Sequence, residues 1–202
     1  MYAVGAGSAA KDALGRYVEI LANRGIAWGL IGPREADRLW ERHVLNSLAV
    51  APFVPDGARV LDVGSGAGLP GVPLALVRPD VEVTLLEPLL RRWRFLVTVV
   101  DELGLEGRVR VERARAEDFA GSFDVVTCRA VAGFETLLRW CAPLVGEGGS
   151  LVALKGRSAS QEVAESREAL ARLRWVAVAR EVVPEGCEEP TWVIEAGRRL
   201  SS

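Results

Sequence analysis

The sequence predicts an α/β fold in which a seven-stranded sheet, mostly parallel with its last strand antiparallel, carries helices on both faces. From residue 59 onward, short apolar segments alternate with segments of helical periodicity, which is the pattern of parallel strands joined by helices. Only the turn-rich residues 184–190 separate the last two apolar segments. With no helix to cross over, these two strands should pair antiparallel as a hairpin.

Composition restricts the class of protein. The chain has 202 residues, of which 50% are hydrophobic, so it can build one sizeable core or a core with a small appendage. No apolar run approaches the roughly 18 residues that span a bilayer, and the first residues lack the basic-then-apolar order of a secretory signal. We therefore expect a cytoplasmic protein with no membrane association, and we infer no protein partner.

Charge and cysteine content exclude further classes. The net charge of −2 argues against a protein that coats nucleic acid through bulk charge. However, 23 of its 25 basic residues are arginines, and only Lys11 and Lys155 are lysines. Arginine side chains bind phosphate well. Cys128, Cys141 and Cys187 are odd in number and widely spaced. With a single histidine besides, we expect neither a disulfide framework nor a metal site.

The N-terminal part predicts a flexible tail over residues 1–10 and a helical cap over residues 11–52. Its first helix should cover residues 11–23, and Gly32-Pro33 should start a second that runs to about residue 50. The buried stripe of that second helix should consist of residues spaced by four: Ala36, Trp40, Val44 and Leu48. Arg34, Arg38 and Arg42 also lie four apart, and they fit either a solvated face or a phosphate-binding ridge. His43 lies beside the buried stripe.

Residues 53–202 contain the predicted sheet. Strands are expected near residues 59–64, 81–86, 108–112, 123–128, 149–155, 175–183 and 191–195. Helices are expected between them, near residues 70–78, 89–104, 134–145 and 160–173. Since ligands of open α/β sheets bind beyond the carboxyl ends of the strands, the residues that follow each strand are the candidate site.

The first strand ends in a glycine-rich turn, residues 59–71, that opens a helix. Read as Asp62-x-Gly64-x-Gly66-x-Gly68, the turn has the form of a loop that binds S-adenosylmethionine (SAM). Read as Gly66-x-Gly68-x-x-Gly71, it satisfies the dinucleotide fingerprint, and a glycine turn without any ligand is a third interpretation. The antiparallel ending and the absence of a second substrate domain favour the SAM interpretation over the dinucleotide one.

The other strand ends supply charged groups. Glu87 follows the second strand, 23 positions after Gly64, where a carboxylate can accept both ribose hydroxyls of an adenosine. Ala116 and Glu117 follow the third strand, where a backbone N–H and a carboxylate could meet the adenine edge. Arg129 ends the fourth strand, and burial of a guanidinium there is expected to require an anion. Lys155-Gly156-Arg157 ends the fifth strand. Two cations beside a glycine fit either contact with phosphate or a solvated loop.

Four segments resemble one family of enzymes. Residues 41–47 (ERHVLNS), 61–75 (LDVGSGAGLPGVPLA), 128–132 (CRAVA) and 153–156 (ALKG) are similar to the bacterial 16S rRNA (guanine-N7)-methyltransferases, also named the glucose-inhibited division protein B family. The resemblance runs from about residue 12 to the end. It differs from the family pattern at Asn46, at Cys128 and in residues 26–32.

The resemblance implies a Rossmann-like class I methyltransferase that uses SAM to methylate N7 of one guanine in 16S rRNA, as naked RNA or within the small ribosomal subunit or its precursor. Family cofactor contacts carry over onto this list: Gly64, Leu69, Glu87, Pro88, Leu89, Ala116, Glu117 and Arg129. Together with Asp62, Gly66 and Gly68 from the loop, these are the predicted cofactor-binding residues. His43, Arg129 and Lys155 are predicted to form the catalytic wall that faces the RNA.

The chemistry needs no nucleophilic triad, because N7 of guanine has a free lone pair and no proton to remove. Two rival enzyme classes stay open on the sequence alone. A small-molecule SAM methyltransferase would share the loop and Glu87, and an NAD-dependent oxidoreductase would use Gly66, Gly68 and Gly71.

Overall fold

The computed structural model describes residues 7–198 and contains one seven-stranded sheet in the order β3-β2-β1-β4-β5-β7-β6. The strands are β1 Arg59–Val63, β2 Glu82–Leu86, β3 Val109–Glu112, β4 Phe123–Arg129, β5 Val145–Lys155, β6 Trp175–Val182 and β7 Thr191–Arg198. The first five pair in parallel, and β7 pairs antiparallel with both β5 and β6. The predicted topology and terminal hairpin are confirmed, and the structure adds that β7 inserts between β5 and β6.

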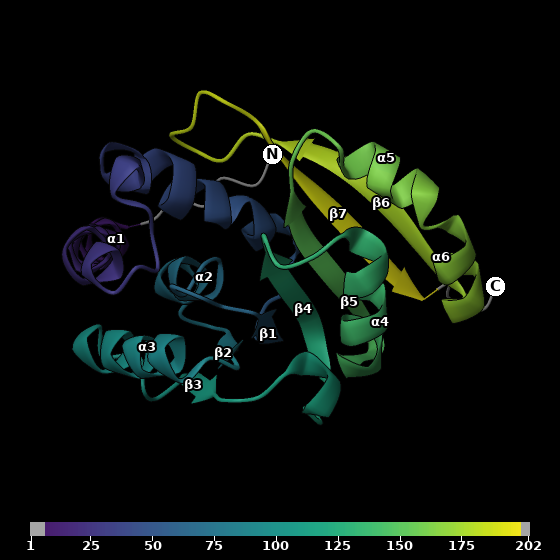
Figure 1. Cartoon of the computed structure of the whole chain (residues 1–202), viewed down its shortest axis with the longest axis horizontal. Coiled ribbons are helices and arrows are strands. Elements are labelled where there is room, and N and C mark those ends of the chain that lie inside the picture. The colour runs from purple at the N-terminus through teal and green to yellow at the C-terminus, as the bar shows by residue number, and fades with distance from the viewer. Residues whose placement is uncertain (1–6, 199–202) are drawn as a thin grey trace.

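Helices cover both faces of the sheet, as predicted, with α1 to α3 on one side and α4 to α6 on the other (Figure 1). Their bounds are α1 Ser8–Ile20, α2 Gly71–Val77, α3 Leu90–Glu102, α4 Phe134–Cys141, α5 Ala159–Glu165 and α6 Arg167–Leu173. Alternate residues of the central strands enter two different cores: Val60 and Val125 face α1 to α3, whereas Leu61 and Val126 face α4. Burial on both faces is why these strands are almost wholly apolar.

The boundaries differ from the predictions in the last helical segment. The helix expected over residues 160–173 is divided at Ser166 into α5 and α6. Ser166 is 3% exposed, and its hydroxyl donates to the carbonyl oxygen of Glu162 at 2.8 Å. A serine that bonds the backbone of its own helix competes with regular helical pairing, so it marks the break.

The cap also differs in detail. α1 begins at Ser8, three residues before the predicted start, while residues 1–6 of the predicted tail lie outside the described residues. A π-helical turn, Leu21–Gly25, continues α1. The prediction of one regular second helix is wrong, because this part of the cap consists of a 3₁₀ helix Pro33–Arg38, a π-helical stretch Leu39–Leu45 and a 3₁₀ helix Leu48–Phe53.

This irregularity changes which side chains are buried. Ala36 is exposed and Trp40 is 40% exposed, while Leu39, which was not in the predicted stripe, is 1% exposed. A spacing of four selects one face only where the helix has about 3.6 residues per turn. The 3₁₀ and π turns have different periods, so the predicted stripe is correct only for Val44 and the half-buried Leu48.

No helix within residues 7–198 is long and apolar enough to cross a membrane.

Candidate functional site

The glycine-rich loop after β1 requires its glycines. Gly64, Gly66 and Gly68 have φ values of +69°, +59° and +103°, a region that side chains other than glycine adopt at a cost. A Cβ atom at Gly64 would lie 2.9 Å from Cγ2 of Val131, in the segment after β4. The backbone turns after β1 and β4 are therefore packed against each other at the carboxyl edge of the sheet.

Gly71 serves packing at the start of α2. A Cβ atom there would lie 2.4 Å from Cδ2 of Leu85 and 2.8 Å from Oδ2 of Asp62. The Gly71 N–H instead donates to Oδ2 of Asp62 at 3.0 Å. Pro70 precedes the helix as its N-cap rather than lying within its first turn. Gly71 is thus explained by helix–strand packing, without a dinucleotide.

Asp62 carries a carboxylate oxygen without a partner. The residue is 0% exposed, and its Oδ1 has no hydrogen bond from any of the described residues. Burial raises the pKa of Asp62 to about 7, and the nearby negative charge of Glu87 adds to this effect. An orphaned buried acceptor is costly, so this position suits a ligand that brings a hydrogen-bond donor or a positive charge.

Glu87 connects the end of β2 to the glycine loop. It is 1% exposed, its Oε2 accepts from the Gly66 N–H at 3.0 Å, and its Oε1 accepts from the Leu89 N–H at 2.9 Å. A carboxylate has about four acceptor positions, so two backbone N–H groups leave room for hydroxyl donors. The sequence placed Glu87 at the site but did not predict that it also holds the loop.

The remaining predicted cofactor residues lie along the same edge of the sheet. Pro88 is half-buried and Leu89 is 52% exposed, directly before α3. Ala116, which is 8% exposed, opens a short 3₁₀ helix, Ala116–Asp118, and Glu117 is exposed within it. Leu69 is half-buried at the end of the glycine loop. The assignment of these positions to the cofactor stays a prediction.

Arg129 has neutral partners rather than the expected anion. Its Nη1 donates to the His43 carbonyl oxygen at 2.8 Å and to Oγ of Ser47 at 2.9 Å. Its Nη2 donates to the Arg42 carbonyl oxygen at 3.2 Å and approaches Nδ1 of His43 at 3.0 Å. Cap carbonyls, a hydroxyl and an imidazole nitrogen therefore provide partners for both terminal nitrogens of the guanidinium, and the anion expected beside Arg129 stays a prediction.

His43 is held in one tautomer by its two neighbours. Arginine can only donate, so Nδ1 must accept from Arg129, and Nε2 carries the proton that it shares with Oε2 of Glu35 at 2.8 Å. Burial lowers the pKa of His43, and the hydrogen bond with His43 lowers the pKa of Glu35. His43 is thus a neutral link between Glu35 and Arg129.

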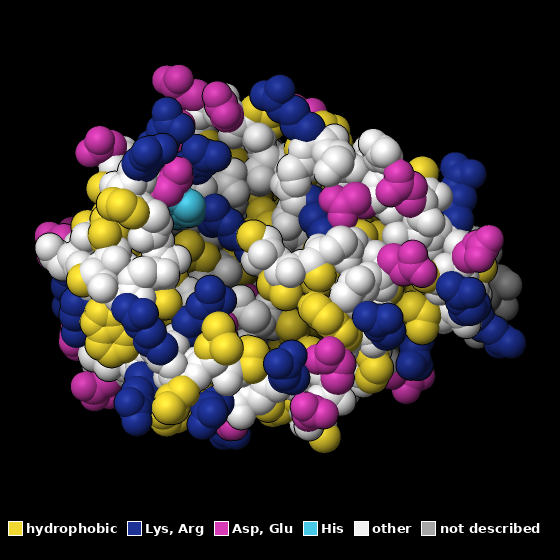
Figure 2. All heavy atoms as spheres, in the orientation of Figure 1, with side chains coloured by type: hydrophobic (Ala, Val, Ile, Leu, Met, Phe, Trp, Pro, Cys, Tyr) yellow, Lys and Arg dark blue, Asp and Glu magenta, His cyan; other side chains and the backbone are white. Residues whose placement is uncertain are grey.

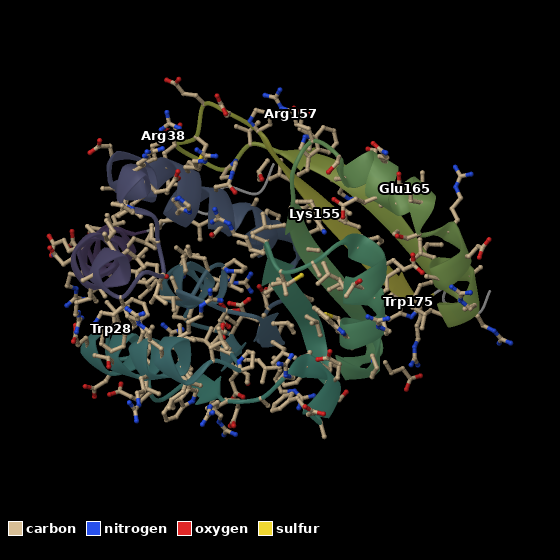
Figure 3. All side chains as sticks on the ribbon, viewed as in Figure 1. Trp28, Arg38, Lys155, Arg157, Glu165 and Trp175 are labelled. Carbon is tan, nitrogen blue, oxygen red and sulfur yellow. The ribbon has the colours of Figure 1, made fainter. Side chains whose placement is uncertain are left out.

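Lys155 is also engaged within the protein. Its Nζ donates to Oε2 of Glu162 and to the Ala132 carbonyl oxygen, both at 2.7 Å, and its side chain is 10% exposed. Arg157, two residues later, is exposed, and Figure 3 shows it at the outer edge of the molecule while Lys155 lies further in, between the strands and α5. The structure brings His43 and Arg129 together and gives Lys155 separate partners.

Tyr17 is a site residue that the sequence did not reveal. It is 0% exposed in α1, and its hydroxyl donates to the carbonyl oxygen of Ala67 in the glycine loop at 2.8 Å. An aromatic residue at helical spacing normally indicates only a core position. The partner of Tyr17 is 50 residues away in the chain, so no local pattern could have identified the contact.

The surface over these strand ends is hollowed in the middle, with Lys and Arg side chains on both sides (Figure 2). Buried carboxylates and positive-φ backbone lie close together at this edge, and no cluster of three or more metal-ligating side chains occurs within residues 7–198. The carboxylate acceptors of Asp62 and Glu87 suit a ligand that brings hydroxyl donors and a cationic group.

Comparisons with known proteins show the family of the chain. The family model described as rRNA small subunit methyltransferase G matches residues 10–188. The chain belongs to this family. A ribosomal RNA small subunit methyltransferase G from Mycolicibacterium smegmatis is 50% identical over 193 residues, which covers 92% of this chain and 80% of that protein. The corresponding protein from Thermobifida fusca is 56% identical over 161 residues, with coverages of 79% and 68%.

Solved structures with low sequence identity share the fold. The Bacillus subtilis tRNA methyltransferase TrmK superposes with a TM-score of 0.60 at 17% identity, covering 76% of this chain and 65% of that one. A predicted O-methyltransferase from Agrobacterium tumefaciens gives a TM-score of 0.59 at 22% identity, with coverages of 76% and 79%. The predicted class I methyltransferase fold is confirmed.

Proposed function

We propose that the protein transfers the methyl group of SAM to N7 of a guanine in 16S rRNA. The observation that carries the proposal is the group formed by the glycine loop, the unpartnered Oδ1 of Asp62 and the carboxylate of Glu87. Membership of the rRNA small subunit methyltransferase G family supports the choice of substrate.

The residues present fit SAM. The α-ammonium of the cofactor would give Oδ1 of Asp62 the donor it lacks, and the ribose hydroxyls would use the remaining acceptor positions of Glu87. The loop glycines keep side chains away from the ligand. Ala116 and Glu117 border the adenine position, and Leu69, Pro88 and Leu89 line the adjoining edge. Bound SAM supplies an electrophilic methyl group on a sulfonium.

In this proposal the protein accelerates the reaction by aligning N7 of guanine with the methyl group of SAM. N7 of guanine attacks with its own lone pair, so no side chain has to remove a proton. Holding the two reactants in line can contribute about 7 to 11 kcal/mol. The target base must be exposed or extruded to reach the site, and it would be read on edges other than N7.

The catalytic wall of His43, Arg129 and Lys155 stays a prediction. In the structure their polar atoms are engaged with Glu35, with the cap backbone and with Glu162. We propose that they shape the RNA-facing edge through these contacts, with Arg129 held beside the cofactor site. We expect phosphate to be gripped first by exposed arginines near the same edge, such as Arg38 and Arg157.

The decisive experiment is transfer of labelled methyl groups from SAM to three substrates: 30S particles, naked 16S rRNA and a metabolite extract. We expect label in rRNA, as 7-methylguanosine after digestion. Comparing the label in naked 16S rRNA with that in 30S particles shows which of the two is the substrate. Label only in small molecules would overturn the rRNA substrate. Calorimetric binding of NAD in place of S-adenosylhomocysteine would overturn the enzyme class.

A further inference from the structure

The glycine loop depends on one polar contact from the cap. Tyr17 lies in α1, and the cap otherwise meets α2 and α3 through apolar side chains and, at the surface, through the ion pair of Arg24 with Glu102 of α3. Its hydroxyl reaches the carbonyl oxygen of Ala67 at 2.8 Å with no exposure to solvent. Burial raises the pKa of Tyr17 well above its usual range, so the hydroxyl keeps its proton and donates it to this bond.

The Ala67–Gly68 peptide group is held at both ends. Its carbonyl accepts from Tyr17, and its N–H, on Gly68, donates to the Ser65 carbonyl oxygen at 2.7 Å. Gly68 has a φ of +103°, and glycine takes positive and negative φ with similar ease. Without the Tyr17 hydroxyl, the bond to Ser65 would be the one remaining hydrogen bond of this peptide group among the described residues.

Side chains pack closely around this peptide group. A Cβ atom at Gly68 would lie 3.0 Å from the Tyr17 hydroxyl oxygen and 2.7 Å from Cγ2 of Val72. The neighbouring Gly66 N–H donates to Glu87 at 3.0 Å. A turn of the Ala67–Gly68 peptide would therefore disturb the part of the loop that contacts Glu87.

We propose that Tyr17 is a positioning residue for the SAM site, whose hydroxyl keeps the Ala67–Gly68 peptide in the orientation that receives the cofactor. This inference rests on the proposed function. Preorganisation of a loop raises affinity because the ordering cost is met before the ligand binds. The cap therefore has a role in cofactor binding as well as covering one face of the sheet.

The test is Tyr17→Phe, which removes one oxygen and keeps the ring. We expect the dissociation constant for S-adenosylhomocysteine, measured by calorimetry, to rise about three- to tenfold, as loss of one buried hydrogen bond predicts. The KM for SAM should rise by the same factor, while kcat at saturating SAM stays within about twofold.

A matched control separates this role from a structural one. Ser166→Ala removes another buried hydroxyl-to-carbonyl bond of 2.8 Å, on the opposite face of the sheet. It should lower the melting temperature and leave the dissociation constant for S-adenosylhomocysteine unchanged. An unchanged dissociation constant in Tyr17→Phe would overturn the positioning role, whereas a wild-type chain that binds no S-adenosylhomocysteine would overturn the proposed function itself.

Discussion

At the scale of single residues, Asp62 shows how a buried carboxyl group lowers stability. Its carboxyl group is buried with one oxygen unpartnered, and its pKa is raised to about 7. The unfolded chain would titrate near the ordinary value of about 3.9. Between these two pH values the folded protein binds more protons than the unfolded one, so the stability of the free protein should fall as pH rises through this window.

Asp62→Asn removes the group that titrates. The asparagine oxygen can still accept from the Gly71 N–H, and no buried charge forms at high pH. We expect the free energy of unfolding of the variant, relative to wild type, to increase between pH 5 and pH 8 by about 1 to 3 kcal/mol. Urea unfolding at the two pH values measures this difference.

The control for this prediction is Asp101→Asn, which removes the same charge from an exposed position on α3. Its effect on unfolding should be small at both pH values. If the effect of Asp62→Asn were equal at pH 5 and pH 8, ionisation of Asp62 would not be coupled to folding. Binding of S-adenosylhomocysteine by Asp62→Asn should be weaker than wild type even where the variant is more stable.

At the scale of elements, Arg129 joins the end of β4 to the cap. Four contacts connect its guanidinium to Arg42, His43 and Ser47. The cap here is built from 3₁₀ and π turns, whose own hydrogen bonds have poorer geometry than those of an α-helix. The arginine fork thus supplies donors that the irregular cap backbone needs.

Arg129→Lys should loosen this junction, because an ammonium cannot reproduce the fork. We expect a loss of about 2 kcal/mol in stability and faster hydrogen exchange in residues 42–47. Mass spectrometry of the exchanged peptides measures the second effect. Arg157→Lys, at an exposed position, is the control and should change neither quantity.

Unchanged exchange with reduced methyl transfer in Arg129→Lys would contradict this role. That result would indicate that Arg129 acts by contacting the cofactor or the RNA instead.

At the scale of the whole molecule, the cap and the sheet share one core. Leu14, Leu21 and Val44 of the cap belong to the same buried cluster as Val60 and Val83 of the sheet. The ring of Trp28 packs on Phe95 of α3 with centroids 5.9 Å apart, and Figure 3 shows Trp28 beside α3 and Trp175 at the far side of the molecule. A shared core makes separate unfolding of the cap unfavourable.

We therefore expect residues 11–52 and 53–202 to unfold together in one transition. Urea curves from circular dichroism and from tryptophan fluorescence should coincide, as two-state behaviour requires. The double variant Trp28→Phe/Trp40→Phe keeps four tryptophans, all outside the cap: Trp93, Trp140, Trp175 and Trp192. It should give a fluorescence curve with the same midpoint as its own circular dichroism curve. Separate midpoints would show that the cap is an independent domain.

The sequence by itself determined the features that depend on local pattern. The alternation of strands and helices, the glycine turn and the acid after the second strand predicted the sheet, its parallel core and the edge where the site lies. The predictions of the sheet and of its parallel core are confirmed, because strand and helix periods and the conformational freedom of glycine act over a few residues. The handedness and proximity rules of α/β folds then restrict the topology.

The tertiary structure decided the features that depend on partners distant in sequence. Arg129 forms hydrogen bonds with residues 82 to 87 positions away, and Tyr17 forms one with Ala67, 50 positions away. Strand β7 enters the sheet between β5 and β6. The 3₁₀ and π turns of the cap likewise depart from its helical pattern. A buried polar group accepts any donor or acceptor of suitable geometry, so its residue type predicts that a partner exists and only the packed chain determines which one.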